Sequence, residues 1–152
     1  MRSRSRSLAG SGAVLVGATS GIGRAAACLS ARQGARLVIA AHNADELVTV
    51  ADECRELGAP AVVTCPTDIS IPGDVARLGR TAREELGAVD VWVNTAAVLL
   101  AGDLTDTPDA DIERIIATNV LGTALVTRAA LPGPDGRPGR TTAGAVRPVA
   151  LP

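Results

Sequence analysis

The sequence predicts an α/β fold in which a parallel β-sheet is covered by helices on both faces. Between residues 13 and 131, short apolar runs alternate four times with segments of helical periodicity, and the connections between them are short. The apolar runs do not alternate between polar and apolar residues, as is typical of strands buried on both faces. Together these two observations favour a parallel sheet with right-handed crossovers.

The four expected strands are runs of mainly apolar residues, with Thr64 and Asp90 as the polar exceptions. The first ends at Gly17, and the fourth contains Trp92, the only aromatic residue of the chain. The expected strands cover residues 13–16, 37–40, 61–64 and 89–93.

Each expected helix has a characteristic residue at one of its ends. Gly34 and Gly87 follow the first and third helices and suit a C-terminal cap. Asp45 could cap the second helix, and Pro108 introduces the fourth. The expected helices cover residues 22–33, 46–57, 73–86 and about 109–131.

Both ends of the chain depart from this pattern. Residues 1–12 are rich in Ser, Arg and Gly and are expected to form a disordered arm. Residues 132–152 hold five of the nine prolines and show no periodicity, which predicts an irregular or disordered tail. The expected domain therefore covers residues 13–131 and is truncated after the fourth strand and the long helix.

Composition narrows the classes of function. The net charge of −1 provides no overall field that would attract nucleic acid or an anionic membrane. No apolar run approaches the roughly 20 residues that a membrane span needs. Cys28, Cys54 and Cys65 have no Cys-x-x-Cys spacing, and with His42 as the only histidine we expect no metal site. Reduced, buried thiols in a cytoplasmic protein are the expected state.

A glycine-rich loop joins the first expected strand to the first expected helix. Unpaired N–H groups at a helix start carry partial positive charge, and glycines let a pyrophosphate approach them closely. Because strand, loop and helix follow in this order, the pattern predicts a Rossmann-type nucleotide-binding domain. The residues expected to bind the cofactor here are Gly17, Thr19, Ser20, Gly21, Ile22 and Gly23.

The end of the second strand bears on the choice of cofactor. An acidic residue there would bind the ribose hydroxyls of NAD, and an arginine would bind the phosphate of NADP. The chain has Ala41-His42-Asn43, which contains neither. The missing acid favours NADP slightly over NAD, with His42 as a phosphate contact; an exposed loop histidine without a role is an equal alternative.

Four segments, in this order and spacing, resemble the short-chain dehydrogenases and reductases. They are the loop Gly17–Gly23, the pair Asp68-Ile69 after the third strand, the turn Asn94-Thr-Ala-Ala97 after the fourth, and Asn119 in the long helix. The resemblance implies that Asp68, Ile69, Asn94 and Ala96 contact the cofactor and that Asn119 belongs to the catalytic group. It also implies hydride transfer between a nicotinamide and an alcohol or carbonyl.

The chain departs from this family in ways that matter for activity. Val16, Thr95 and Ala97 replace residues common in the family's motifs, and these changes are mild. In the family a tyrosine transfers the proton and a lysine lowers its pKa, but this chain contains neither residue, and all fifteen of its basic residues are arginine. Because tyrosine is a poor base at neutral pH without a nearby cation, Asn119 alone cannot replace the pair. We therefore expect no turnover by this chain alone.

Three hypotheses follow from this mixture of features. The chain could be a truncated or frameshifted oxidoreductase, a non-catalytic nucleotide-binding module, or an interaction protein. In the third case the long helix would pair with a second copy or with a full-length relative. A sheet ordered 3-2-1-4 leaves residues 89–93 as an apolar edge and part of residues 112–131 exposed, which predicts poor solubility of the isolated chain.

Overall fold

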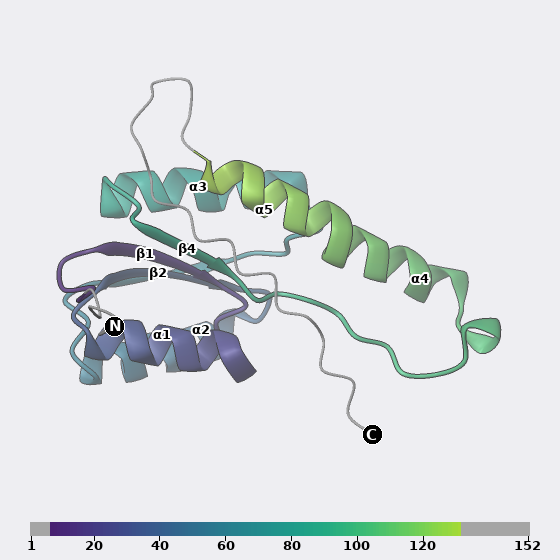
Figure 1. The fold of residues 1–152 in the computed structure, drawn as a ribbon, viewed down its shortest axis with the longest axis horizontal. Coiled ribbons are helices and arrows are strands. Elements are labelled where there is room, and N and C mark those ends of the chain that lie inside the picture. Colours follow the sequence, from purple (N-terminus) through teal and green to yellow (C-terminus); the bar gives the residue numbers. More distant parts are fainter. Residues whose placement is uncertain (1–6, 132–152) are drawn as a thin grey trace, which may run out of the picture.

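The computed structural model describes residues 7–131, which form a three-layer arrangement of helices around a parallel sheet (Figure 1). The sheet has four strands in the order β3-β2-β1-β4, as the sequence predicts. The strands are β1 (Gly12–Val16), β2 (Arg36–Ala41), β3 (Val62–Pro66) and β4 (Val91–Asn94). Each begins and ends within two residues of its expected position, and all pairs are parallel.

The central strand β1 divides the core into two clusters. Ala13 and Leu15 face the helices α1 and α2, whereas Val14 and Val16 face α3 and α5. Val14 lies in register with Val38 on one neighbour and Trp92 on the other. Because helices cover both faces of the sheet, the central strands β1 and β2 are buried at nearly every position, which explains their apolar runs. The edge strands β3 and β4 are half-buried along much of their length.

The first three helices cross between the strands and differ from expectation mainly at their starts. Asn43, not Asp45, caps the second helix: its side-chain oxygen accepts hydrogen bonds from the N–H groups of Asp45 at 3.0 Å and Glu46 at 3.3 Å. The helix consequently begins two residues earlier than expected. The bounds are α1 (Gly21–Arg32), α2 (Ala44–Glu56) and α3 (Pro72–Leu86).

The long helix is interrupted by a π-helical segment that the sequence did not predict. Its parts are α4 (Asp109–Ile115), the π-helix η2 (Ile116–Gly122) and α5 (Thr123–Ala130), preceded by the short 3₁₀ turn η1 (Leu104–Asp106). Gly122 is buried at the end of η2, and a Cβ built there would lie 2.7 Å from Cγ1 of Ile69. The helix therefore approaches the β3–α3 loop more closely than a side chain would allow.

The described part of the expected N-terminal arm lies against the sheet. Leu8 packs on the cluster under α1 and α2, the Gly10 N–H donates to the Gly34 carbonyl at 2.9 Å, and Gly12 already belongs to β1. The rest of the arm, residues 1–6, and the expected tail, 132–152, lie outside the described residues. Within residues 7–131, no helix has the length and apolar character needed to cross a membrane.

Candidate functional site

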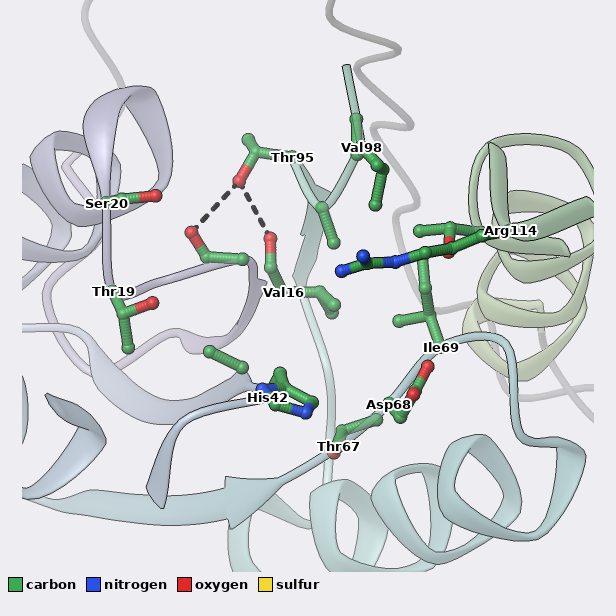
Figure 2. A pocket seen from close by; sticks show the side chains of 15 residues that line it. Val16, Thr19, Ser20, His42, Thr67, Asp68, Ile69, Thr95, Val98 and Arg114 are labelled. Carbon is green, nitrogen blue, oxygen red and sulfur yellow. Dashed lines mark hydrogen bonds between the residues drawn. The ribbon is translucent and has the colours of Figure 1, made fainter. Parts of the chain in front are cut away.

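A pocket of about 270 Å³ lies at the carboxyl ends of the strands, where the loops after β1, β2, β3 and β4 meet helix α4 and segment η2 (Figure 2). In open α/β sheets this edge is where ligands bind. Seven of the residues expected to contact a cofactor line the pocket: Gly17, Thr19, Ser20, His42, Asp68, Ile69 and Ala96.

The glycine loop is held tightly against the turn after β4. A Cβ on Gly17 would lie 2.6 Å from Oγ1 of Thr95, and one on Gly23 would collide with the Gly17 carbonyl oxygen. Thr95 Oγ1 in turn donates to the Val16 carbonyl at 2.8 Å. The two glycines are therefore required for loop packing, and Thr95 joins β4 to the end of β1.

The N-terminus of α1 is open toward solvent beside this loop. Ser20 occupies the N-cap position, but its side chain makes no capping hydrogen bond, and the first turn contains no acidic residue. Gly21 has φ +48°, and a Cβ there would meet nothing within 4 Å. The first N–H groups of a helix without a cap can donate hydrogen bonds to an anionic group, so this end is suited to a phosphate.

The loop after β3 presents Asp68 to the pocket and is fixed by local hydrogen bonds. One oxygen of Asp68, Oδ1, accepts from the N–H and the hydroxyl of Ser70 at 2.9 and 2.6 Å. The Asp68 N–H donates to Asp74 Oδ2 at 3.0 Å, and Asp74 Oδ1 accepts from Arg77 at 2.8 Å. These two contacts, the backbone N–H first and Arg77 second, lower the pKa of Asp74.

His42 is exposed at the carboxyl end of β2 and lines the pocket. The next residue, Asn43, is directed away to cap α2, so it does not compete for a ligand. At the end of the second strand, where NAD-binding domains often carry an acidic residue, this chain therefore has an imidazole. Among the described residues, no group of three or more His, Cys, Asp or Glu side chains could hold a metal ion.

Five of the predicted residues do not line the pocket, for different reasons. Gly21 and Ile22 are exposed in the first turn of α1, and Gly23 is buried beneath the loop. Asn94 accepts a hydrogen bond from the Ala96 N–H at 3.2 Å and thereby shapes the turn. Asn119 lies in η2 and bonds to the loop after β4.

The side chain of Asn119 is joined twice to the backbone of Val98. Its Oδ1 accepts from the Val98 N–H, and its Nδ2 donates to the Val98 carbonyl, each at 2.8 Å. This pair holds η2 against the wall of the pocket. A catalytic role for Asn119 stays a prediction.

Eight further residues line the pocket that the sequence did not predict, most of them small or apolar. Thr95 had a signal, because it replaces the asparagine usual in the family's turn. Arg114 and Thr118 share one side of the helix at a spacing of four, yet helical periodicity alone cannot tell a pocket from solvent. The missed residues are Val16, Ala41, Thr67, Thr95, Ala97, Val98, Arg114 and Thr118.

Comparisons with known proteins agree with this geometry. The family model described as short chain dehydrogenase matches residues 11–142. The oxidoreductase YxnA of Bacillus subtilis (strain 168) is 39% identical over 124 residues, covering 82% of this chain and 35% of that protein. An oxidoreductase of Staphylococcus aureus (strain MRSA252) is 36% identical over 120 residues, covering 79% of this chain and 51% of that protein.

Solved structures show the same relationship. A short-chain dehydrogenase/reductase from Mycobacterium marinum superposes with a TM-score of 0.77 at 33% identity, covering 82% of this chain and 50% of that one. A short-chain dehydrogenase from Burkholderia cenocepacia J2315, solved in complex with NADP, gives 0.76 at 28% identity, covering 82% and 51%. A 7α-hydroxysteroid dehydrogenase complexed with NADH gives 0.74 at 33% identity, covering 80% and 47%.

The chain thus spans between about a third and a half of the length of these relatives. The sequence match is supported by the sheet order and by the glycine loop beside the pocket. The chain belongs to the short-chain dehydrogenase/reductase family of oxidoreductases.

Proposed function

We propose that this chain binds a nicotinamide dinucleotide along the carboxyl edge of its sheet. The observation that carries the proposal is the uncapped N-terminus of α1, where Gly21 leaves open space beside the pocket. The first N–H groups of α1 would bind the pyrophosphate. Asp68 and Ile69 would hold the adenine, as the family resemblance implies.

For the choice of cofactor we propose a slight preference for NADP. His42 would approach the ribose 2′-phosphate from the end of β2, where no acidic side chain repels it. One related structure is complexed with NADP and another with NADH, so the family accommodates both. Parallel titrations with NADPH and NADH test the preference, and tighter binding of NADH would contradict it.

Binding can be measured through Trp92, the only aromatic residue. Its fluorescence, corrected for absorption by free NADPH, is expected to fall on binding because excited Trp92 transfers energy to the bound reduced nicotinamide. Gly21→Asp places a carboxylate at the phosphate position and is expected to abolish binding, since like charges repel. Gly21→Asn is the matched control, because it places a side chain of the same size at the same φ of +48° without the charge. Equal binding by the Gly21→Asp and Gly21→Asn variants would refute the proposal.

We further propose that these 152 residues do not catalyse hydride transfer by themselves. The parent activity would be transfer between a nicotinamide and an alcohol or carbonyl. The chain contains no tyrosine and no lysine, and the Asn119 amide is already engaged by Val98. Oxidation of NADPH in the presence of a panel of aldehydes and ketones is expected to stay at the background rate. A protein-dependent rate would contradict this proposal.

A second candidate function is pairing with another chain through the long helix. Ile116, Val120 and Leu121 are 54%, 59% and 47% exposed along η2, and β4 is an edge strand of the described sheet. Exposed apolar surface of this kind marks interfaces or aggregation-prone regions. Sedimentation analysis alone and mixed with a full-length relative tests it. Val120→Glu is expected to weaken the association, and a monomer under all conditions would exclude it.

A further inference from the structure

One pocket residue has a charge that the family motifs do not account for. Arg114 comes from α4, the helix opposite the glycine loop, and Figure 2 shows its side chain extending from that helix into the pocket. Its backbone is fixed within a regular helical turn, whereas the residue as a whole is exposed. The guanidinium is therefore free to meet a ligand that occupies the pocket.

Arg114 has no partner within residues 7–131. The ion pairs of this part of the chain join Arg24 to Glu53, Arg55 to Asp52 and Arg77 to Asp74. No hydrogen bond of the Arg114 side chain occurs there either. Arg32, Arg80, Arg83 and Arg128 make no ion pair within these residues either, but none of them lines the pocket. What distinguishes Arg114 is that its unpaired side chain is directed into the cavity.

The few charges of the pocket suggest what kind of ligand Arg114 would bind. Among residues 7–131, Arg114 and Asp68 are the only formally charged side chains that line it, and one oxygen of Asp68 is already engaged by Ser70. The chain has no lysine that could supply a positive charge. The N-terminus of α1 offers only partial charge, while a guanidinium offers a full charge and two parallel donors for phosphate oxygens.

We propose that Arg114 binds a phosphate group of the dinucleotide and so completes the anion site from the side opposite α1. The inference rests on the proposed function, because it requires the cofactor to lie in this pocket. The phosphate is either the pyrophosphate, which NAD and NADP share, or the 2′-phosphate that only NADP carries. A guanidinium would bind either phosphate in the same way. Comparing NADPH with NADH, which lacks the 2′-phosphate, distinguishes the two.

The test compares the full chain with Arg114→Gln, Arg114→Lys and the matched control Arg128→Gln. Arg128 is exposed in the last turn of α5 and does not line the pocket. The probes are NADPH, NADH and adenosine, which has no phosphate. Melting curves establish that each variant is folded; Arg114 has no partner to lose, so Arg114→Gln is expected to melt with the unaltered chain.

The expected result is that Arg114→Gln weakens NADPH binding about 10-fold or more, as for loss of a charged hydrogen bond. Adenosine binding and the Arg128→Gln variant should be unchanged, and Arg114→Lys should fall between. An equal loss for NADH identifies the pyrophosphate as the partner, and a loss confined to NADPH identifies the 2′-phosphate. Affinity for NADPH should also depend less on salt in Arg114→Gln than in the unaltered chain.

Two results would overturn this inference while leaving the proposed function intact. One is an unchanged NADPH affinity in Arg114→Gln. The other is an equal loss of adenosine affinity, which would show that the guanidinium contacts the base. If the unaltered chain binds none of the three probes, the proposed function fails and this inference fails with it.

Discussion

Asn119 and Val98 are joined by two hydrogen bonds of 2.8 Å, one in each direction between the side-chain amide and the backbone. The pair connects the π-helical segment of the long helix to the loop that follows β4. Since Val98 lines the pocket, Asn119 positions part of its wall without reaching the cavity itself. A residue that the family resemblance marks as catalytic thus has a structural role that is independent of turnover.

We expect Asn119→Ala to lower the free energy of unfolding by about 1–3 kcal/mol, because it leaves two half-buried backbone groups of Val98 without partners. Asn119→Asp keeps the acceptor for the Val98 N–H but sets a carboxylate oxygen against the Val98 carbonyl, so it should lose at least as much stability as Asn119→Ala. Urea unfolding followed by Trp92 fluorescence measures both. An Asn119→Ala variant as stable as the unaltered chain would show that water replaces the pair at no cost.

Replacing glycines of the cofactor loop by alanine should have effects that depend on the space around each. A Cβ at Gly23 meets the Gly17 carbonyl, which is backbone and cannot move aside, so Gly23→Ala should shift the loop or unfold the domain. Gly73→Ala is the control, because its Cβ meets nothing within 4 Å and alanine favours helices. Melting temperatures distinguish them. Equal melting temperatures would mean that the loop packs less tightly than described.

Stability should fall in alkaline solution because of a buried thiol. Burial between α1 and α2 raises the pKa of Cys54 from 9.0 to about 12. Below the unfolded value this group contributes no pH dependence. Above it, the unfolded chain releases the thiol proton while the folded chain keeps it. The free energy of unfolding should then drop by about 1.4 kcal/mol per pH unit until the folded thiol titrates.

The absence of tyrosine and lysine makes this alkaline effect measurable, because the usual groups that titrate in that range are missing. Cys54→Ala should start from a lower stability, by about 1 kcal/mol for the lost packing, and should show a shallower slope. Cys28, whose pKa burial also raises, accounts for a remainder of the same sign. Identical slopes in the variant and the unaltered chain, measured by urea unfolding at several alkaline pH values, would contradict the assignment.

In acid, Asp74 should control the stability of the β3–α3 loop. The Asp68 N–H and the Arg77 guanidinium both favour the charged form, so its folded pKa lies below the ordinary 3.8. Its stabilising effect is therefore complete above the ordinary value and is lost as the pH falls through the lowered one.

Asp74→Asn keeps an acceptor for the Asp68 N–H but removes the charge. We expect it to cost about 1 kcal/mol at neutral pH and to flatten the decline of stability in acid. Thermal melts across the acid range measure this. A decline as steep as in the unaltered chain would assign the effect to other carboxylates.

Much of the fold follows from local sequence. Mainly apolar runs specify the strands, and glycines such as Gly34 end helices because they adopt positive φ. These signals depend on residues close together in the chain. Even the error at Asp45 is local: two neighbouring residues could both cap α2, and Asn43 does so because its oxygen reaches two N–H groups.

What the sequence determined by itself is the strand order and the identity of the glycine loop, since both depend on short-range pattern and chain topology. Tertiary structure alone decided the rest: that the long helix passes through a π segment, that Thr95 ties β4 to β1, and that Arg114 enters the pocket. These features arise where segments distant in sequence come into contact. The periodicity of one segment shows which of its faces is buried, but it does not show which other segment packs against that face.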